Sequence, residues 1–252
     1  MKNIVRVCVI FILVSSCATK KEILYMQDSI DYPQTALEFS SPKIQPNDIL
    51  KIVVGALVQE SALPYNKLTN GGNTGGVALM QLEGYLVSED NTINFPQLGP
   101  ISTNNKTVLE LQEHIKVLLE DGGHLKDPSV NVRLLNAKVT ILGEVNQPGT
   151  FNFTEYNITL LQALGYAGDL TINGKREDII VLRETEGNRV ISHIDLTSTN
   201  FINTAFYQIR PNDVIIVNPN NPKVKSAGFV GNTSTVISVI SILLTTVVLI
   251  TR

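Results

Sequence analysis

Residues 44–54 read IQPNDILKIVV, a turn signal that runs directly into a strand. Pro-Asn-Asp favours a turn, and the aliphatic run after it predicts a β-strand. Residues 209–217 repeat the phrase as IRPNDVIIV, 165 residues further along the chain. Two copies indicate a reused turn-strand unit and are too few for a solenoid. We expect Asp48 and Asp213 to cap their own turns, which is the usual role of this residue in such a turn, and not to act as catalytic acids.

Outward from these two phrases, the patterns predict a β-rich α+β body. Residues 84–87 and 92–96 flank Glu89-Asp90-Asn91 and are expected to form a hairpin. Thr107 begins a helix with capping-box spacing to Glu110, and a second helix is expected at residues 159–167. Further strands are expected at residues 130–134, 138–145, 179–183, 190–196 and 214–217. The predicted domains are two lobes, residues 42–136 and 137–220, preceded by an extended leader at residues 17–41.

Composition excludes several classes of protein. The 252 residues carry 20 Lys+Arg and 23 Asp+Glu, for a net charge of −3, so a dedicated nucleic-acid binder is not expected. A hydrophobic content of 43% is too high for a disordered chain. The two cysteines are too few for a disulfide framework or a four-thiolate zinc site.

The first 16 residues are typical of a secretion signal. Lys2 and Arg6 precede a short apolar run, and small residues precede Cys17. The sequence Val-Ser-Ser-Cys at 14–17 resembles the bacterial lipobox, which implies lipidation of Cys17; an ordinary signal peptide with a chance cysteine is the alternative. Ala18 after Cys17 resembles the lipoprotein sorting signal for the outer membrane. The mature chain would then have lost Cys8 and carry no free thiol.

Residues 228–251 are predicted to form a C-terminal transmembrane helix, because they lack charge and would extend about 36 Å as a helix. Their hydroxyl groups follow one line of that helix, at Ser234, Ser238, Ser241 and Thr245. Three interpretations stay open: hydroxyls bonded to their own helix's carbonyls, a stripe for helix packing, or the lining of a wet pore. A membrane at both ends would place the body beside that membrane or between two.

No signal for catalysis, cofactor or metal is found. His114, His124 and His193 lack ligand partners at metal spacing, and neither a phosphate loop nor a nucleophile elbow occurs. Glu89 and Asp90 could join another acid in glycan cleavage, but a hairpin tip favours solvated turn residues. The chain is not expected to be an enzyme or to hold a cofactor.

Several phrases together resemble one known family. Residues 44–52, GYLV at 84–87, INFPQLG at 93–99 and DPSVNV at 127–132 resemble the polysaccharide export domain. VTILGEVNQPG at 139–149, with LLQAL at 160–164 and Ala-Gly at 167–168, resembles an SLBB (soluble-ligand-binding β-grasp) domain. In this order, and with Cys17 and the apolar C-terminus, the chain resembles the Wza-like outer-membrane polysaccharide export (OPX) lipoproteins.

The resemblance implies a homo-oligomeric ring with its body in the periplasm. It further implies that capsular polysaccharide or exopolysaccharide passes through a pore of C-terminal helices and that an inner-membrane polysaccharide copolymerase docks underneath. In that setting the hydroxyl stripe would face the lumen or the neighbouring helix. The alternative function is a non-channel glycan-binding or scaffold lipoprotein of the cell envelope. A single SLBB domain implies a shorter ring than that of members with more repeats.

Overall fold

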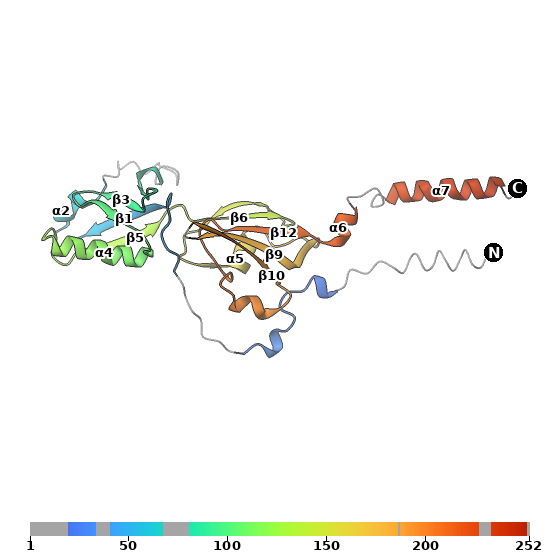
Figure 1. Cartoon of the computed structure of the whole chain (residues 1–252), viewed down its shortest axis with the longest axis horizontal. Helices are drawn as coiled ribbons and strands as arrows, with labels where there is room; N and C mark the ends of the chain where they lie inside the picture. Colours follow the sequence, from blue (N-terminus) through green and yellow to red (C-terminus); the bar gives the residue numbers. More distant parts are fainter. Residues whose placement is uncertain (1–19, 34–40, 68–80, 186, 227–232, 251–252) are drawn as a thin grey trace.

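The chain folds into two lobes that lie end to end, followed by a helix that extends away from the second lobe (Figure 1). The computed structural model describes residues 20–33, 41–67, 81–185, 187–226 and 233–250. The first lobe runs from β1 to β5 and the second from β6 to β12. Each lobe has its own cluster of buried apolar side chains, so the molecule has two cores. The predicted class, a mixed helix-and-strand protein with a β-rich body, is confirmed.

The first lobe is built on an antiparallel sheet of order β2-β1-β5, which comprises β1 (Ile49–Gly55), β2 (Tyr85–Leu86) and β5 (Ser129–Leu134). Strand β1 lies in the centre and alternates buried and exposed residues, as a strand with one wet face must. Two short helical segments follow β1: α2 (Gln59–Ala62) and η3 (Leu63–Tyr65). The phrase at residues 44–54 therefore supplies the central strand of this lobe.

Helix α4 (Val108–Asp121) packs on this sheet, and the predicted capping box at its start is confirmed. Thr107 Oγ1 accepts from the Glu110 amide at 3.2 Å, and Glu110 Oε2 accepts from the Thr107 amide at 2.7 Å. Three side chains of α4 are completely buried: Leu111, Ile115 and Leu119. Each contributes about 1.5–3 kcal/mol of hydrophobic stabilisation. A helix of 14 residues is only marginally stable in isolation, so this packing is what stabilises α4.

The predicted hairpin over residues 84–96 is wrong. Strand β2 pairs with β1 instead, and β3 (Thr92–Phe95) forms a hairpin with β4 (Gly99–Ser102). Tyr85 is drawn into the core, where its ring stacks on Phe95 at 5.5 Å, and its backbone finds a partner in β1. Burial of this ring therefore decided the pairing, and the turn signal at 89–91 only reverses the chain.

The second lobe is a five-stranded sheet of order β10-β9-β12-β6-β7. Its strands are β6 (Lys138–Gly143), β7 (Gly149–Asn152), β9 (Gly174–Thr185), β10 (Asn188–Ile194) and β12 (Val214–Pro219). Strand β12, supplied by the second turn-strand phrase, lies in the middle, parallel to β6 and antiparallel to β9. A Cβ on Gly143 would lie 2.0 Å from the Val217 carbonyl oxygen, so only glycine permits this close approach.

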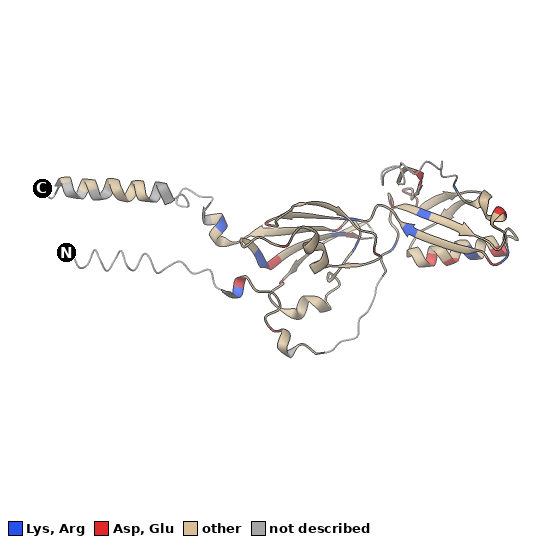
Figure 2. Ribbon diagram, turned by 180° about the vertical axis from the view of Figure 1, so that it is seen from behind, with Lys and Arg blue, Asp and Glu red and all other residues tan. Residues whose placement is uncertain are grey.

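One face of this sheet is covered by α5 (Leu160–Tyr166), which begins at a second capping box between Thr159 and Gln162. Strands β8 (Ile158–Thr159) and β11 (Gln208–Ile209) form a small separate ladder, and η4 (Thr199–Asn203) and α6 (Asn221–Ser226) complete the lobe. Basic and acidic positions are interspersed over both lobes (Figure 2).

The leader is not merely extended, which corrects the prediction for residues 17–41. Within its described part it forms η1 (Lys20–Glu22) and η2 (Ser29–Asp31) and lies against the second lobe. The Met26 amide donates to Leu196 O at 3.0 Å, and the Gln27 amide donates to Thr197 O at 2.8 Å. The carbonyl groups of Leu196 and Thr197, just after β10, thus serve as hydrogen-bond acceptors for the leader backbone. No pattern in the leader sequence predicts this contact.

The C-terminal helix α7 spans Thr233–Ile250, and residues 228–232 and 251 of the predicted span lie outside the described residues. In the described part of the chain, no helix is long and apolar enough to cross a membrane, so the predicted transmembrane helix is corrected.

Candidate functional site

The two turn aspartates lie where each lobe's central strand begins, near the junction of the lobes. The residue before each adopts a left-handed backbone, with φ 70° at Asn47 and 69° at Asn212. Asp48 Oδ2 accepts from the Gln45 amide and Asp213 Oδ2 from the Arg210 amide, both at 2.8 Å. Both carboxylates cap their own turns, as the sequence predicts.

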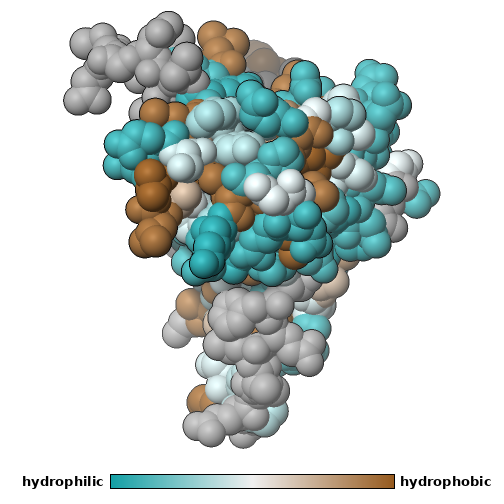
Figure 3. Space-filling model, turned by 90° about the vertical axis from the view of Figure 1, so that its left-hand side faces the viewer, coloured by the Kyte–Doolittle hydropathy of each residue, from teal (hydrophilic) through white to brown (hydrophobic). Residues whose placement is uncertain are grey.

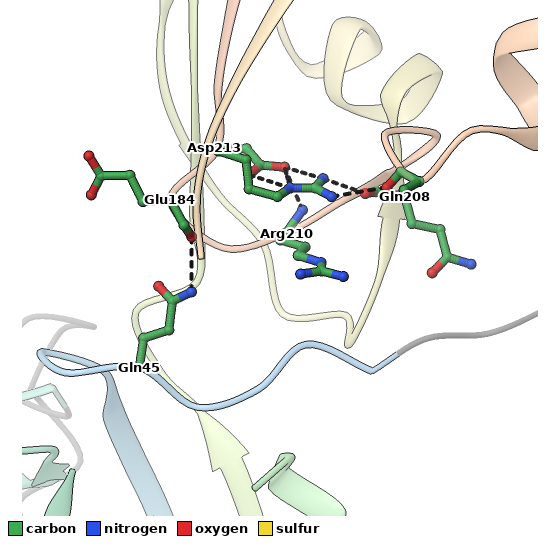
Figure 4. A network of polar contacts seen from close by, with 7 residues as sticks. Gln45, Glu184, Gln208, Arg210 and Asp213 are labelled. Atoms are coloured by element: carbon green, nitrogen blue, oxygen red, sulfur yellow. Dashed lines mark hydrogen bonds and ion pairs between the residues drawn. The ribbon is translucent and has the colours of Figure 1, made fainter. Parts of the chain in front are cut away.

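Asp213 has a second role, because it also pairs with Arg183 of strand β9. Arg183 Nε donates to Oδ1 at 3.0 Å and Nη2 donates to Oδ2 at 2.7 Å, with both side chains at most 5% exposed. Arg183 Nη1 and Nη2 also donate to the Ala205 and Gln208 carbonyl oxygens, at 2.9 and 2.8 Å respectively (Figure 4). Burial raises the pKa of the Asp213 carboxyl, and the Arg183 guanidinium opposes that rise. The pair therefore holds the β11–β12 turn against the centre of the sheet.

Asp48 differs, because no ion-pair partner is found for it among the described residues. Burial raises the pKa of Asp48 to about 6, and the hydrogen bond from the Gln45 amide lowers it only in part. The two turns are alike, but their carboxylates differ in charge environment. Asp213 is paired with the buried Arg183, whereas Asp48 has no counter-charge among the described residues.

A groove of about 1250 Å³ lies between the two lobes. One wall comes from the first lobe and the segment before β1, and the other comes from the β9–β10 turn and the turn before β12. Gln45 Nε2 bridges the walls by donating to the Glu184 carbonyl oxygen at 3.2 Å (Figure 4). The polar residues that line the groove are Ser41, Lys43, Gln45, Asp48, Asn91, Asn104, Asn105, Glu184, Thr185, Asn188, Arg189 and Arg210.

A smaller cavity shares part of the wall of this groove, including Pro42, Leu134 and Pro211. It is lined by the aromatic ring of Tyr156, which is 44% exposed. The guanidinium of Arg133 lies 5.9 Å from the centre of that ring. The junction of the lobes therefore combines amides, cations and an accessible aromatic ring.

The outer end of the first lobe carries exposed apolar side chains near α2. Leu57 is 98% exposed, and Val58 and Leu63 are each 56% exposed. Viewed from this end, hydrophobic areas interrupt a mainly hydrophilic surface (Figure 3). Apolar side chains grouped in this way are typical of a contact surface for another protein.

The predicted hydroxyl stripe falls within α7, where the side chain of Ser234 is outside the described residues. Thr245 Oγ1 donates to the Ser241 carbonyl oxygen at 2.7 Å, and Thr246 Oγ1 donates to Ile242 O at 2.8 Å. The Thr245 hydroxyl is thus hydrogen-bonded to a carbonyl of its own helix, which is the first of the three interpretations of the stripe. Ile237, Ile242 and Leu249 are between 64% and 73% exposed, so α7 offers apolar surface to a partner.

The other sequence candidates lie apart from one another. His124 bonds the Tyr65 hydroxyl at 3.2 Å, and His193 bonds Asp178 at 2.5 Å, while His114 lies on α4. Among the described residues, no group of three His, Cys, Asp or Glu side chains is arranged to hold a metal ion. Glu89 and Asp90 lie on an exposed turn before β3. Cys17 lies outside the described residues.

Sequence reasoning missed Arg183 and the groove. Arg183 ends the aliphatic run IIVLR of β9 and falls on the same face as Ile179 and Val181. A charge on the apolar face of a strand signals a buried partner. The groove has no such signal, because its walls come from segments up to 170 residues apart.

Comparison with known proteins gives two consecutive matches. Residues 38–135 match the family described as polysaccharide biosynthesis/export protein, and residues 137–217 match the SLBB domain. The EPS I polysaccharide export outer membrane protein EpsA of Ralstonia solanacearum is 28% identical over 221 residues, which cover 84% of this chain and 57% of the relative. The protein of the same description from Ralstonia nicotianae is 29% identical over 185 residues, which cover 70% of this chain and 47% of the relative. The chain thus spans about half the length of the curated relatives it matches. With an export domain followed directly by one SLBB domain, it belongs to the polysaccharide export (OPX) family.

Proposed function

We propose that this chain is an outer-membrane subunit of a polysaccharide export machine and that polysaccharide is the molecule it moves. The observation that carries the proposal is the order of the two matched domains over residues 38–217, shared with relatives named as polysaccharide export outer membrane proteins.

The working form is a homo-oligomeric ring whose centre passes the polymer. Helix α7 supplies the contact between neighbouring subunits, since its apolar side chains are exposed in the single chain. The stripe Ser234, Ser238, Ser241 and Thr245 faces the neighbouring helix or the lumen. Small hydroxyl-bearing residues let helices approach closely, and hydroxyls offer a passing glycan hydrogen bonds without holding it by charge.

The body lies in the periplasm and is anchored to the outer membrane through a lipid on Cys17. An acyl chain contributes about 0.8 kcal/mol per buried CH₂, so two or more chains make a firm anchor. An inner-membrane polysaccharide copolymerase contacts the opposite end of the molecule. The exposed side chains Leu57, Val58 and Leu63 near α2 suit such a contact.

Removal of the gene for this chain tests the proposal. We expect loss of polymer from the cell surface and accumulation inside the envelope, with recovery when the full chain is supplied. A chain that ends at residue 232 keeps Cys17 and both lobes but lacks α7, and it should fail to restore export. Full recovery by this shortened chain would instead support a scaffold or glycan-binding lipoprotein.

A further inference from the structure

We propose that the groove between the two lobes is a binding site for an acidic segment of a polysaccharide. The proposal rests on the proposed export function and goes beyond it, because it assigns a place in the subunit and a chemical class to the ligand. The site is formed only when both lobes are present, since each supplies one wall.

The size and position of the groove suit an oligosaccharide. Ligand sites commonly occupy about 300–1000 Å³ and occur preferentially between domains. The groove, at about 1250 Å³, is open enough to admit several sugar units of a longer chain. An open trough also lets a polymer enter sideways, which a closed pocket would prevent.

Side-chain amides line both walls of the groove. Asn91, Asn104 and Asn105 come from the first lobe, and Asn188 is the first residue of strand β10 in the second. An amide both donates and accepts hydrogen bonds, so it matches the hydroxyl groups of a sugar in either role. The backbone of Asn91 and Asn105 is left-handed, with φ 54° and 58°, which fixes how these side chains leave their turns.

The charge of the groove selects an acidic glycan. Its lining contains the cations Lys43, Arg189 and Arg210 and the carboxylates of Asp48 and Glu184. Asp48 is only 4% exposed and accepts a hydrogen bond from the Gln45 amide, so its carboxylate contributes little charge to the groove surface. Glu184 is 64% exposed and pairs with Arg189, so Lys43 and Arg210 leave the accessible surface of the groove with a net positive charge, although the whole chain has a net charge of −3.

Each cationic residue of the groove makes a hydrogen bond within the protein. Arg189 pairs with Glu184 at 2.6 Å, and Lys43 is hydrogen-bonded to Asn105. The backbone amide of Arg210 is fixed to Asp213 at 2.8 Å, so the buried Arg183–Asp213 pair positions the residue that carries this guanidinium. A guanidinium recognises a carboxylate with two parallel hydrogen bonds.

Tyr156 lies beside the groove, where its ring is 44% exposed. An exposed ring can pack against the apolar C–H face of a sugar, while the amides and cations take the polar edge. The combination of an aromatic face, amides and cations distinguishes this groove from the apolar surface near α2.

The test measures binding of labelled hexamers to the purified full chain in mild detergent by fluorescence anisotropy at pH 7. The probes are oligomers of galacturonic, mannuronic or sialic acid, with maltohexaose as the neutral match. We expect at least one acidic hexamer to bind, more weakly at high salt, and maltohexaose to bind at least about tenfold more weakly.

Two groove variants and one control complete the design. Arg210→Gln removes a cation, and Asn104→Asp adds an opposing charge; each should weaken acidic binding about tenfold or more. Lys126→Gln removes the same charge from an exposed position outside the groove lining and should leave affinity unchanged. Thermal unfolding of each variant checks that it is folded. If Arg210→Gln destabilises the turn that carries residue 210, Asn104→Asp alone tests the contribution of groove charge to binding.

The proposal is overturned if none of the acidic hexamers binds, if maltohexaose binds equally well, or if the groove variants behave like Lys126→Gln. Surface polymer is scored separately in cells. Binding without any export by the unmodified chain contradicts the proposed function alone. Export by a chain that binds no acidic hexamer contradicts the groove assignment alone.

Discussion

Arg183 and Asp213 form a two-point ion pair almost wholly out of contact with water, with Nε–Oδ1 and Nη2–Oδ2 distances of 3.0 and 2.7 Å. Asp48 occupies the equivalent turn in the first lobe, and in the described part of the chain it has no such partner. The two copies of one turn-strand phrase thus differ in their electrostatics, and that difference makes their contributions to stability separable by experiment.

Replacing Arg183 by Met should destabilise the protein by about 3–5 kcal/mol, because Asp213 would remain buried without a counter-charge. Urea unfolding at pH 7 measures this change. Arg189→Met is the matched control, since the Arg189–Glu184 pair is 67% and 64% exposed and should contribute at most about 1 kcal/mol. Similar losses in the two variants would show that burial of the first pair does not matter.

Stability should depend on the titration of Asp48. Its pKa is raised from 3.8 in the unfolded chain to about 6 in the fold, so between these values the folded state binds more protons. This group therefore makes the protein more stable as pH falls from 7 towards 4, by about 1–3 kcal/mol. Asp48→Asn keeps an acceptor for the Gln45 amide and should abolish the effect.

The measurement is the difference in unfolding free energy between the unmodified chain and Asp48→Asn at pH 4.5, 5.5, 6.5 and 7.5. Taking the difference cancels other carboxyls, such as Asp178, whose pKa the His193 hydrogen bond lowers. A difference that stays constant over this range would contradict the raised pKa of Asp48.

The leader should detach when its polar clamp is removed. Tyr25 donates to Asp169 at 2.5 Å, and Asp28 accepts from the Thr199 amide at 2.7 Å. The double change Tyr25→Phe with Asp28→Ala should cost about 1–3 kcal/mol and speed tryptic cleavage after Lys21. Tyr156→Phe lies outside the clamp and should leave the cleavage rate unchanged. An equal rate in all three proteins would show that the leader is held by something else.

Association through α7 should be sensitive to the size of the stripe residues. Ser238→Leu with Ser241→Leu places bulk where helices are proposed to approach and should shift the protein in detergent towards smaller species. Ile237→Leu conserves volume on the same helix and should not. Size-exclusion chromatography with light scattering makes the comparison, and unchanged assembly in the Ser variants would remove the stripe from the interface.

Local signals predicted much of the fold. Capping boxes at Thr107 and Thr159 and the Pro-Asn-Asp turns are short-range chemistry, so the sequence shows them directly. Strand partners are not local. Nothing near Tyr85 says that its strand pairs with β1 and not with β3, because that choice depends on where its ring is buried.

The site was harder to predict for the same reason. The groove joins Lys43 to Arg210 across the lobe junction, and no residue spacing records such a contact. At the C-terminus the signal was local: the apolar run at residues 228–251 predicted a helix, and the described helix Thr233–Ile250 lies within that range.

The central claim is that the chain works as a ring that passes polysaccharide. Electron-microscopy projections of the full chain, purified in mild detergent from envelopes that export polymer, test this most directly. We predict closed rings with a central opening, and only small particles from the chain that ends at residue 232. A population of single two-lobed particles from the full chain, in cells that still place polymer on their surface, would contradict the account.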